Sequence, residues 1–323
     1  MPITLPPISR RRFLASSLAA AAGGVLGRRA WADGGAGRRV DPNRFALISD
    51  THVAADPKAA NKGVTMFDTL TKVRADVLAF GETRPAFALV NGDLAFNEGK
   101  PADYRTFLDA VRPLQEAGMP VHLGLGNHDH RENFWAAVPA VGNVARPVEN
   151  RHVTVVESPL ADWVMLDSLE ATNKTPGLLG AAQLAWLAKV LDERPGKSCV
   201  VVVHHNPQPM PATRPAAPPP AATRPQTRPA VTGLRDTAEL LALLRPRRQA
   251  KALVFGHSHR WERAEVDGLH LVNLPTTAYP FKPNMVTGWV DCVLSPGGAR
   301  LTVRAVDAKH PQHNEVAELA WRG

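Results

Sequence analysis

Acidic, amide and imidazole side chains stand at the ends of five apolar runs of this sequence. The five polar ends are Asp50-Thr51-His52, Gly92-Asp93, Gly126-Asn127-His128-Asp129, His204-His205 and Gly256-His257-Ser258-His259. A single end of this kind usually marks a turn, but five in succession indicate a metal site. Carboxylate, imidazole and amide oxygen ligands without thiolate suit Fe, Mn, Zn or Co rather than a structural zinc ion.

The number of candidate ligands indicates two metal ions. Seven ligands are too many for one tetrahedral ion and fit two ions that share a bridging carboxylate. Two ions about 3.5–4 Å apart are the arrangement for in-line hydrolysis of phosphate esters. A hydroxide held between them is the nucleophile, because metal binding lowers the pKa of water. The ions also stabilise the charge that builds on the phosphoryl oxygens.

These residues need a scaffold that brings five strand ends to one rim. Short apolar runs predict strands over residues 45–48, 87–90, 121–125, 152–156, 163–166, 199–203, 252–255, 261–266, 269–274, 286–294 and 300–306. Helical spacing predicts helices over residues 66–80, 104–114, 181–191 and 237–244. Strand–helix alternation with a strand-rich end predicts an α/β domain built on mixed sheets. In such folds ligands gather at the carboxyl ends of strands.

The five motifs, which cover residues 44 to about 275, resemble those of the calcineurin-like metallophosphoesterase family. The resemblance implies a four-layer α/β/β/α sandwich with two mixed β-sheets. It also implies two sets of metal ligands: Asp50, His52 and His259 for the first ion, Asp93 as the bridge, and Asn127, His204 and His257 for the second. His204 is preferred to His205 because the family's ligand is the first residue of a His-His-x-Pro turn.

The same resemblance implies a reaction. His128 is similar to the family's catalytic histidine, which stabilises the transition state and protonates the leaving alkoxide, and Asp129 is expected to orient its ring by hydrogen bonding. The implied function is dimetal-dependent hydrolysis of a small phosphate ester, a diester in preference to a monoester. An exported phosphomonoesterase or nucleotidase is one alternative, and a metal- and phosphate-binding protein without turnover is another. An inactive relative is expected to lose His128 or a ligand, whereas all eight positions are filled here.

One position narrows the resemblance. Purple acid phosphatases place a metal-binding Tyr three residues after the bridging Asp, and this chain has Phe96 there, which cannot ligate. The chain length and the His257-x-His259 ending look closer to the bacterial cyclic-nucleotide and glycerophosphodiester phosphodiesterase branch.

The N-terminus has the pattern of an export signal. Ser9-Arg10-Arg11-Arg12-Phe13-Leu14 has the twin-arginine order, an Ala-rich stretch follows over residues 15–26, and Ala30-Trp31-Ala32 offers a small-x-small cleavage site. We therefore expect residues 1–32 to be a twin-arginine signal peptide, so that the export machinery delivers the protein to the periplasm or the outside of the cell. The stretch is shorter than the ~20 residues that span a bilayer. Cleavage and retention of the signal both stay open.

The net charge of +8 is concentrated in two segments. Residues 1–32 contain five arginines and residues 206–230 contain three, and neither segment has an acidic residue. The rest of the chain carries equal numbers of basic and acidic residues, so no basic surplus is left to neutralise a nucleic-acid backbone. We expect one catalytic domain over residues 33–323, with 206–230 as a Pro-rich insertion that is either disordered or a substrate-facing flap. The sequence leaves open the oligomeric state and whether Cys199 and Cys292 pair.

Overall fold

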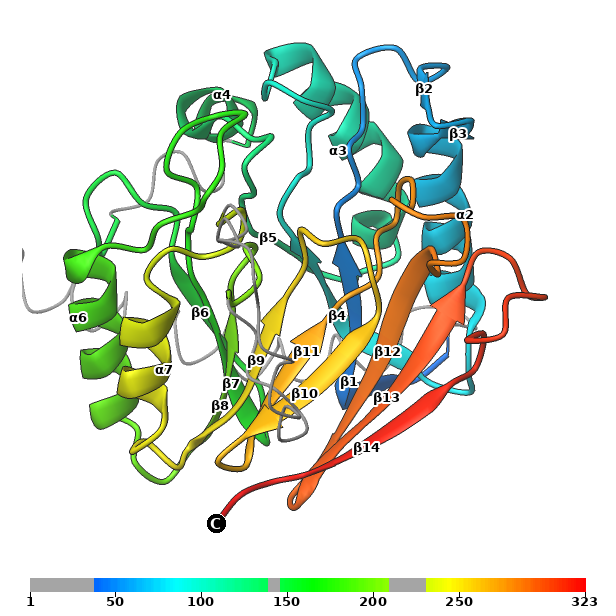
Figure 1. Ribbon diagram of the computed structural model, residues 1–323. Coiled ribbons are helices and arrows are strands. Elements are labelled where there is room, and N and C mark those ends of the chain that lie inside the picture. Colours follow the sequence, from blue (N-terminus) through cyan, green and yellow to red (C-terminus); the bar gives the residue numbers. More distant parts are fainter. Residues whose placement is uncertain (1–37, 139–145, 209–230) are drawn as a thin grey trace, which may run out of the picture. The chain divides into compact units, whose positions relative to one another are not determined.

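Three neighbouring strands of the first sheet are parallel, so their carboxyl ends lie at one rim. The structure is a computed structural model that describes residues 38–138, 146–208 and 231–323 (Figure 1). The sheet has the order β14-β13-β12-β1-β4-β5, in which β1, β4 and β5 are parallel and the others antiparallel to their neighbours. Its strands are β1 (Val40–Ser49), β4 (Arg84–Asn91), β5 (Val121–Leu123), β12 (Gly288–Ser295), β13 (Gly298–Ala305) and β14 (Val316–Ala320).

The second sheet is also mixed and has its parallel strands in the middle. Its order is β10-β11-β9-β8-β7-β6, with the two edge strands antiparallel to their neighbours. Its strands are β6 (Thr154–Glu157), β7 (Ala161–Met165), β8 (Ser198–Val202), β9 (Ala250–Phe255), β10 (Glu262–Val266) and β11 (Leu269–Asn273). A short hairpin of β2 (Ala60–Asn61) and β3 (Val64–Thr65) precedes the first described helix.

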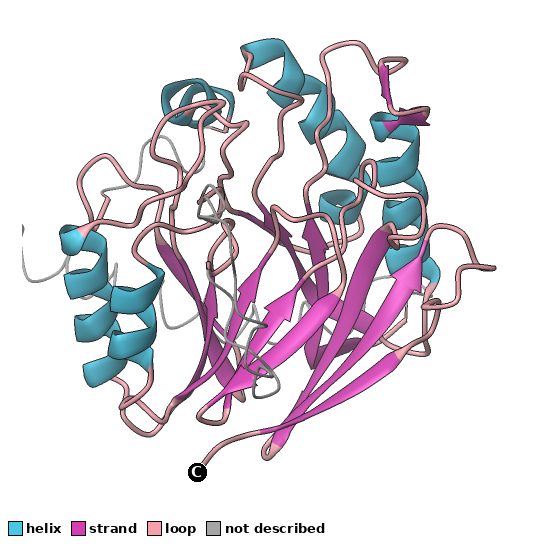
Figure 2. Ribbon diagram, viewed as in Figure 1, coloured by secondary structure: helices cyan, strands magenta, loops and turns pink. Residues whose placement is uncertain are grey.

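Helices cover the outer face of each sheet (Figure 2). On the first sheet these are α2 (Met66–Ala79), α3 (Pro101–Glu116) and α4 (Arg131–Ala137). On the second sheet they are α6 (Ala181–Asp192) and α7 (Thr237–Leu244). The layers are therefore helix, sheet, sheet and helix, which confirms the predicted α/β sandwich. None of the described helices is both long enough and apolar enough to cross a membrane.

Alternation along each central strand supplies both faces of its sheet. In β1, Phe45 and Leu47 point between the sheets, while Ala46 and Ile48 point toward the helices. The ring of Phe45 lies 5.0 Å from that of Trp163 on β7, centroid to centroid, so aromatic packing joins the two sheets. Residues 45–48 of β1 are buried and apolar on both faces, so the polar residues come where the strand ends. The polar residues therefore collect at the rim.

The structure extends and corrects the predicted elements. Helix α3 begins at Pro101 rather than at residue 104, because Pro is tolerated in the first turn of a helix. The hairpin, α4 and β14 were not predicted from the sequence. The predicted signal peptide and residues 209–230 of the predicted insertion lie outside the described residues. Cys199 and Cys292 are both buried free thiols, and they belong to different core layers.

Candidate metal centre

The seven predicted ligands come together at the rim where strands of both sheets end. They follow β1 (Asp50, His52), β4 (Asp93), β5 (Asn127), β8 (His204) and β9 (His257, His259). All of these side chains are buried except that of His257, which is partly exposed. A set of polar groups removed from water in this way needs partners of its own.

The Asp and His side chains of the site form three overlapping groups. In each group the nearest donor atoms lie within 4.8 Å of one another. The groups are Asp50, His52 and His259; His52, Asp93 and His128; and Asp93, His204 and His257. Because His52 and Asp93 each belong to two groups, the cluster is continuous. Such a chain of donors fits two ions that share a ligand.

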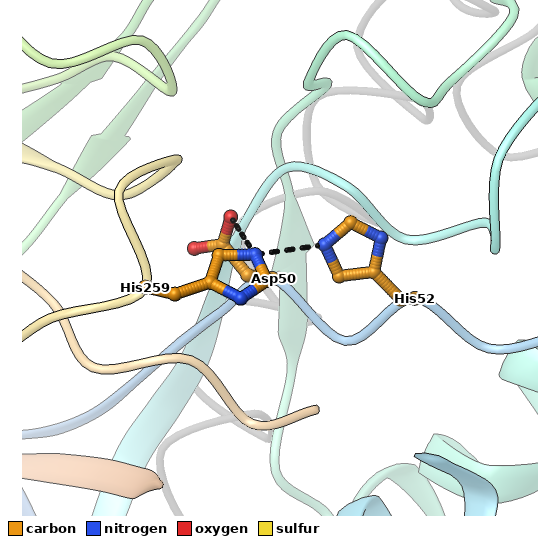
Figure 3. Close-up of side chains that lie close together, drawn as sticks. All are labelled: Asp50, His52 and His259. Carbon is orange, nitrogen blue, oxygen red and sulfur yellow. Dashed lines mark hydrogen bonds and ion pairs between the residues drawn. The ribbon is translucent and has the colours of Figure 1, made fainter. Parts of the chain in front are cut away.

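The first group holds two imidazole nitrogens that need a cation. Nε2 of His52 lies 3.0 Å from Nε2 of His259, and Oδ1 of Asp50 lies 3.5 Å from the latter atom. Figure 3 shows the two rings facing each other beside Asp50. Burial lowers the pKa of both histidines, to about 4 for His52, so both rings stay neutral. Each Nδ1 faces a backbone carbonyl and must carry the ring hydrogen, which leaves two lone pairs pointing at each other. A metal ion held by both nitrogens would remove the repulsion.

Asp93 lies at the centre of the cluster. Its Oδ2 is 3.5 Å from Nε2 of His52 and 3.3 Å from Nε2 of His204. Burial acts to raise the pKa of Asp93, but His204, His52 and His128 together outweigh burial and hold that pKa well below its usual value. Burial likewise acts to lower the pKa of His204, but Asp93, Asp50 and the carbonyl of Asn91 together raise it to about 10. The carboxylate of Asp93 thus attracts a positive charge to this position.

Two buried donor atoms of the second set have no hydrogen-bond partner among the described residues. They are Oδ1 of Asn127 and Nε2 of His204, whose approach to Asp93 is too poorly aligned to be a hydrogen bond. An unpaired buried polar atom is costly, and both atoms belong to residue types that bind transition metals. The donor set therefore fits the metal ions that the sequence predicts.

Backbone carbonyls orient every imidazole of the cluster. The ring nitrogen away from the cluster lies 2.6–3.2 Å from a carbonyl oxygen in each case: Phe96 for His52, Asn97 for His128, Asn91 for His204, Thr232 for His257 and Tyr279 for His259. A carbonyl accepts only, so it fixes the hydrogen on that nitrogen and leaves the other nitrogen free to ligate. His257 differs from the rest in giving its Nε2 to the carbonyl, so that Nδ1 is its ligating atom.

The backbone is strained at most of the ligands. Five of the seven ligands have φ between 45° and 66°: Asp50, His52, Asp93, His257 and His259. This left-handed region costs a non-glycine residue of order 1–3 kcal/mol and persists where the surrounding structure imposes it. Burial of the site raises the pKa of Asp50 and the charge of His204 lowers it. Burial is the larger effect, so the pKa is raised to about 7. Backbone strain and buried charge both mark this rim as a functional site.

Gly126 permits the close approach of two strand ends. A Cβ at this position would collide with the Asp93 carboxylate and would lie 2.7 Å from Nε2 of His204. Only a residue without a side chain fits between the Asp93 carboxylate and His204 of the other sheet. The glycine before Asn127 is therefore part of the site's construction.

The predicted role of Asp129 is wrong as far as the His128 ring is concerned. Nδ1 of His128 donates to the carbonyl of Asn97 at 3.0 Å. The Asp129 carboxylate instead accepts the backbone N–H groups of Leu94, Ala95 and Gly126. A buried carboxylate satisfies whichever donors surround it, and here these donors are main-chain groups. Asp129 thus ties the loop after β4 to the loop after β5.

Tyr104 on α3, which the sequence does not mark as a functional residue, completes this network. Its hydroxyl donates to Asp129 at 3.2 Å and accepts from the backbone N–H of His130 at 2.8 Å. Within helix α3 it has only the pattern of a core residue, so no sequence signal distinguishes it. His205, to which His204 was preferred as a ligand, is buried, and its Nδ1 lies 2.8 Å from the hydroxyl of Ser168.

Comparison with known proteins identifies the family. A family model described as calcineurin-like phosphoesterase matches residues 43–261. The protein therefore belongs to the calcineurin-like phosphoesterase family and is a hydrolase that acts on ester bonds.

Two curated relatives carry more specific names. The chain is 28% identical over 264 residues to a probable cyclic nucleotide phosphodiesterase of Synechococcus sp.. The aligned region covers 79% of this chain and 89% of that protein. It is 26% identical over 283 residues to the 3′,5′-cyclic adenosine monophosphate phosphodiesterase CpdA of Escherichia coli, covering 86% of this chain and 92% of that one.

Solved structures share the fold. A dimetal phosphatase from Danio rerio aligns with a TM-score of 0.63 and 16% sequence identity, over 87% of this chain and all of that one. GAP50, the anchor in the inner membrane complex of Plasmodium, aligns with a TM-score of 0.56 and 14% identity. At these identities the likeness concerns the architecture alone.

Proposed function

We propose that the protein hydrolyses phosphodiesters with two transition-metal ions, and that its substrates are 3′,5′-cyclic nucleotides. The observation that carries the proposal is the continuous donor cluster in which Asp93 lies between His52 and His204. The relatives named as cyclic nucleotide phosphodiesterases cover most of the chain and support the substrate class. Fe, Mn, Zn and Co all suit the donor set.

The chain's own residues divide into two ligand sets. Asp50, His52 and His259 would hold one ion, Asn127, His204 and His257 the other, and Asp93 both. When bound, the ions supply a nucleophilic water of lowered pKa and Lewis acidity toward the phosphoryl oxygens.

His128 is the residue that moves a proton. Its backbone N–H donates to Oδ1 of Asp93 at 2.8 Å, which fixes the residue at the edge of the cluster. Its Nδ1–H is held by the carbonyl of Asn97, so Nε2 is the nitrogen that takes up a second proton and passes it to the leaving oxygen, which returns the ring to its neutral form. His128 is partly exposed, unlike most of the ligands, as a residue that meets substrate must be.

A hydrolysis panel tests the proposal. The full-length protein, stripped with a chelator and reloaded with Mn, Fe, Zn or Co, is assayed with cyclic AMP, bis-p-nitrophenyl phosphate, p-nitrophenyl phosphate and a glycerophosphodiester. We expect metal-dependent turnover of cyclic AMP, with kcat/KM above that of the monoester by about tenfold or more. Absence of turnover with every metal would contradict the enzyme proposal, and a preference for the monoester would favour a phosphomonoesterase.

The twin-arginine signal remains part of the proposal, and the pattern of residues 9–14 supports it. We propose that the folded protein is exported with its metal ions already bound. In a host with a twin-arginine pathway, the wild-type chain should reach the periplasm. The variant Arg11→Lys/Arg12→Lys should stay in the cytoplasm. Equal fractionation of both chains would contradict export by this route.

A further inference from the structure

A cavity of about 310 Å³ lies beside the metal cluster. Its lining includes His257, Ser258, Arg260, Asn273, Phe281 and Gln208. His257 is one of the candidate ligands, so a molecule whose phosphoryl group lies at the cluster can extend an attached group into this cavity. The volume is at the lower end of the range for sites that enclose a drug-sized organic ligand, ~300–1,000 Å³. A three-carbon alcohol would leave most of it unfilled.

Asn273 gives the cavity an unsatisfied polar wall. This residue ends β11 and is 2% exposed. Its Nδ2 contacts the hydroxyl of Ser258, and its Oδ1 has no hydrogen-bond partner among the described residues. If the amide were turned so that Oδ1 and Nδ2 changed places, Nδ2 would lack a partner instead of Oδ1. A buried amide atom without a partner is costly, so this position favours a ligand that offers a hydrogen bond.

Phe281 gives the cavity an apolar wall at a defined place. The residue is 50% exposed, which is unusual for a large apolar side chain. Its ring stacks on His259 with the centroids 4.1 Å apart and an angle of 8°, and Nζ of Lys62 lies 4.8 Å from its centroid. Because His259 and Lys62 lie against the two faces of the ring, its edge is left free for contact. The edge of an aromatic ring packs well against the face of another flat ring.

Arg260 adds a planar cation at the same cavity. Its guanidinium reaches Glu262 at 3.4 Å, and both side chains are 46% exposed. Guanidinium groups stack on the faces of nucleobases, and Asn and Gln amides pair with the donor and acceptor atoms along a base edge. The ring edge of Phe281, the plane of Arg260 and the amides of Asn273 and Gln208 together form a surface for a heteroaromatic base.

We propose that this cavity binds the nucleoside part of a cyclic nucleotide while the phosphate lies at the metal cluster. The proposal rests on the proposed function and assigns its substrate specificity to residues outside the ligand set. Phe281 and Arg260 are specificity-determining residues, and they discriminate nucleotides from phosphate esters of small alcohols.

Binding of a nucleotide product tests the proposal without turnover. The metal-loaded full chain is titrated calorimetrically with adenosine 5′-monophosphate and with inorganic phosphate, and metal content is measured for each variant. We expect wild-type protein to bind the nucleotide about tenfold or more tightly than phosphate. The variant Phe281→Ala/Arg260→Ala should lose most of this ratio. The control Val316→Ala/Arg300→Ala removes a similarly exposed apolar residue and an Arg with a Glu partner, and should keep the ratio.

The outcomes separate this proposal from the proposed function. Equal affinity of the wild type for nucleotide and phosphate, or an unchanged ratio in the double variant, overturns the cavity proposal even where cyclic AMP is hydrolysed. A nucleotide preference that depends on Phe281 and Arg260, in a protein that turns over no cyclic AMP, supports the cavity and refutes the proposed reaction. Both substituted side chains are at the surface, so the double variant should fold.

Discussion

The two sheets contribute different chemistry to one site. The strand ends of the first sheet carry both carboxylates, Asp50 and Asp93, whereas the strand ends of the second sheet carry only imidazoles, His204, His257 and His259. The negative charge that would attract a metal ion therefore comes from the first sheet. Most of the imidazole donors come from the second sheet. Neither sheet holds a complete ligand set.

Hydrogen bonds across the rim join these two halves. The backbone N–H of His257 donates to the Asp50 carboxylate at 3.0 Å, and Nδ1 of His204 donates to the carbonyl of Asn91 at 2.9 Å. The side-chain amide of Asn91 donates in turn to the carbonyl of Val203 at 3.0 Å. Because each ligand set draws on both sheets, we expect metal binding and the packing of the sheets to be coupled. Each of the following experiments disturbs one half of the site, or the contact between the halves.

The largest effect is expected from Asp93→Ala, which removes the carboxylate shared by the two ligand sets. We expect hydrolysis to fall by more than the ~10²–10⁴-fold that a single acid–base residue contributes, with loss of bound metal. Rate assays and elemental analysis measure both. Asp192→Ala, which removes an exposed carboxylate paired with Arg247, should change neither quantity. Retention of metal and rate in Asp93→Ala would rule out the shared ligand.

Replacement of His128 should separate catalysis from metal binding. In His128→Ala we expect kcat to fall by ~10²–10⁴-fold, because the proton donor is lost, while the metal content stays at the wild-type value. In His204→Ala, on the second sheet, both kcat and metal content should fall. If His128→Ala also lost its metal, then His128 would be a ligand rather than an acid.

Trp163→Ala should weaken the contact between the sheets. Trp163 is 1% exposed and packs against Phe45 and Phe87 of the first sheet. Its truncation should lower the free energy of unfolding by ~3–5 kcal/mol, measured by urea denaturation, and should also weaken metal binding. Trp186→Ala, in the partly exposed outer helix α6, should cost less and leave metal affinity unchanged. Unaltered metal affinity in Trp163→Ala would argue against the coupling.

Tyr104→Phe should reveal how the first sheet positions its loops. The change deletes only the hydroxyl that bonds Asp129 and the backbone of His130. We expect kcat to fall about tenfold, as for residues that support metal ligands indirectly, at nearly unchanged thermal stability. Thr106→Val removes a hydroxyl from the same helix that bonds Ala55, and it serves as the matched control. Equal rates in both variants would show that this network has no influence on His128.

The smallest effect concerns His152, which reaches from the start of β6 in the second sheet to the carbonyl of Leu123 in β5. Burial lowers its pKa below the usual value in the folded protein. The unfolded chain therefore binds a proton at higher pH, so this contribution to stability is lost as pH falls below about 6.5. Urea unfolding at about pH 7.5 and about pH 5.5 should show a smaller acid loss in His152→Gln than in wild type. Identical losses would contradict this reading of His152.

Much of the fold was predictable because burial on both faces makes the central strands continuous apolar runs that end at a polar residue. Asp50 and Asp93 stand at such ends, and their positions at one rim follow from the parallel order of their strands. The strand β14 was missed because its inward positions include the small residue Ala317, which leaves a weak apolar pattern. Helix α4 is only seven residues long, too short for a periodic signal.

The partners of the ligands were less predictable than the ligands themselves. Asp129 was expected to orient the His128 ring because carboxylates often do so. The ring is oriented instead by the carbonyl of Asn97, and a carbonyl is present in every residue. Its role depends on the three-dimensional course of the loop after β4, which the identity of the side chains does not specify. The same holds for the carbonyl of Thr232 beside His257.

This reliance on the main chain bears on how the site tolerates genetic change. No side-chain replacement deletes a carbonyl, so substitutions at Phe96, Asn97 or Thr232 leave the orienting oxygen in place unless they shift the backbone. Saturation mutagenesis around the site should therefore find the ligands, His128 and Gly126 intolerant, and Phe96, Asn97 and Thr232 permissive. Selection for a different metal would act through loop length and backbone course, where the ring orientations are set.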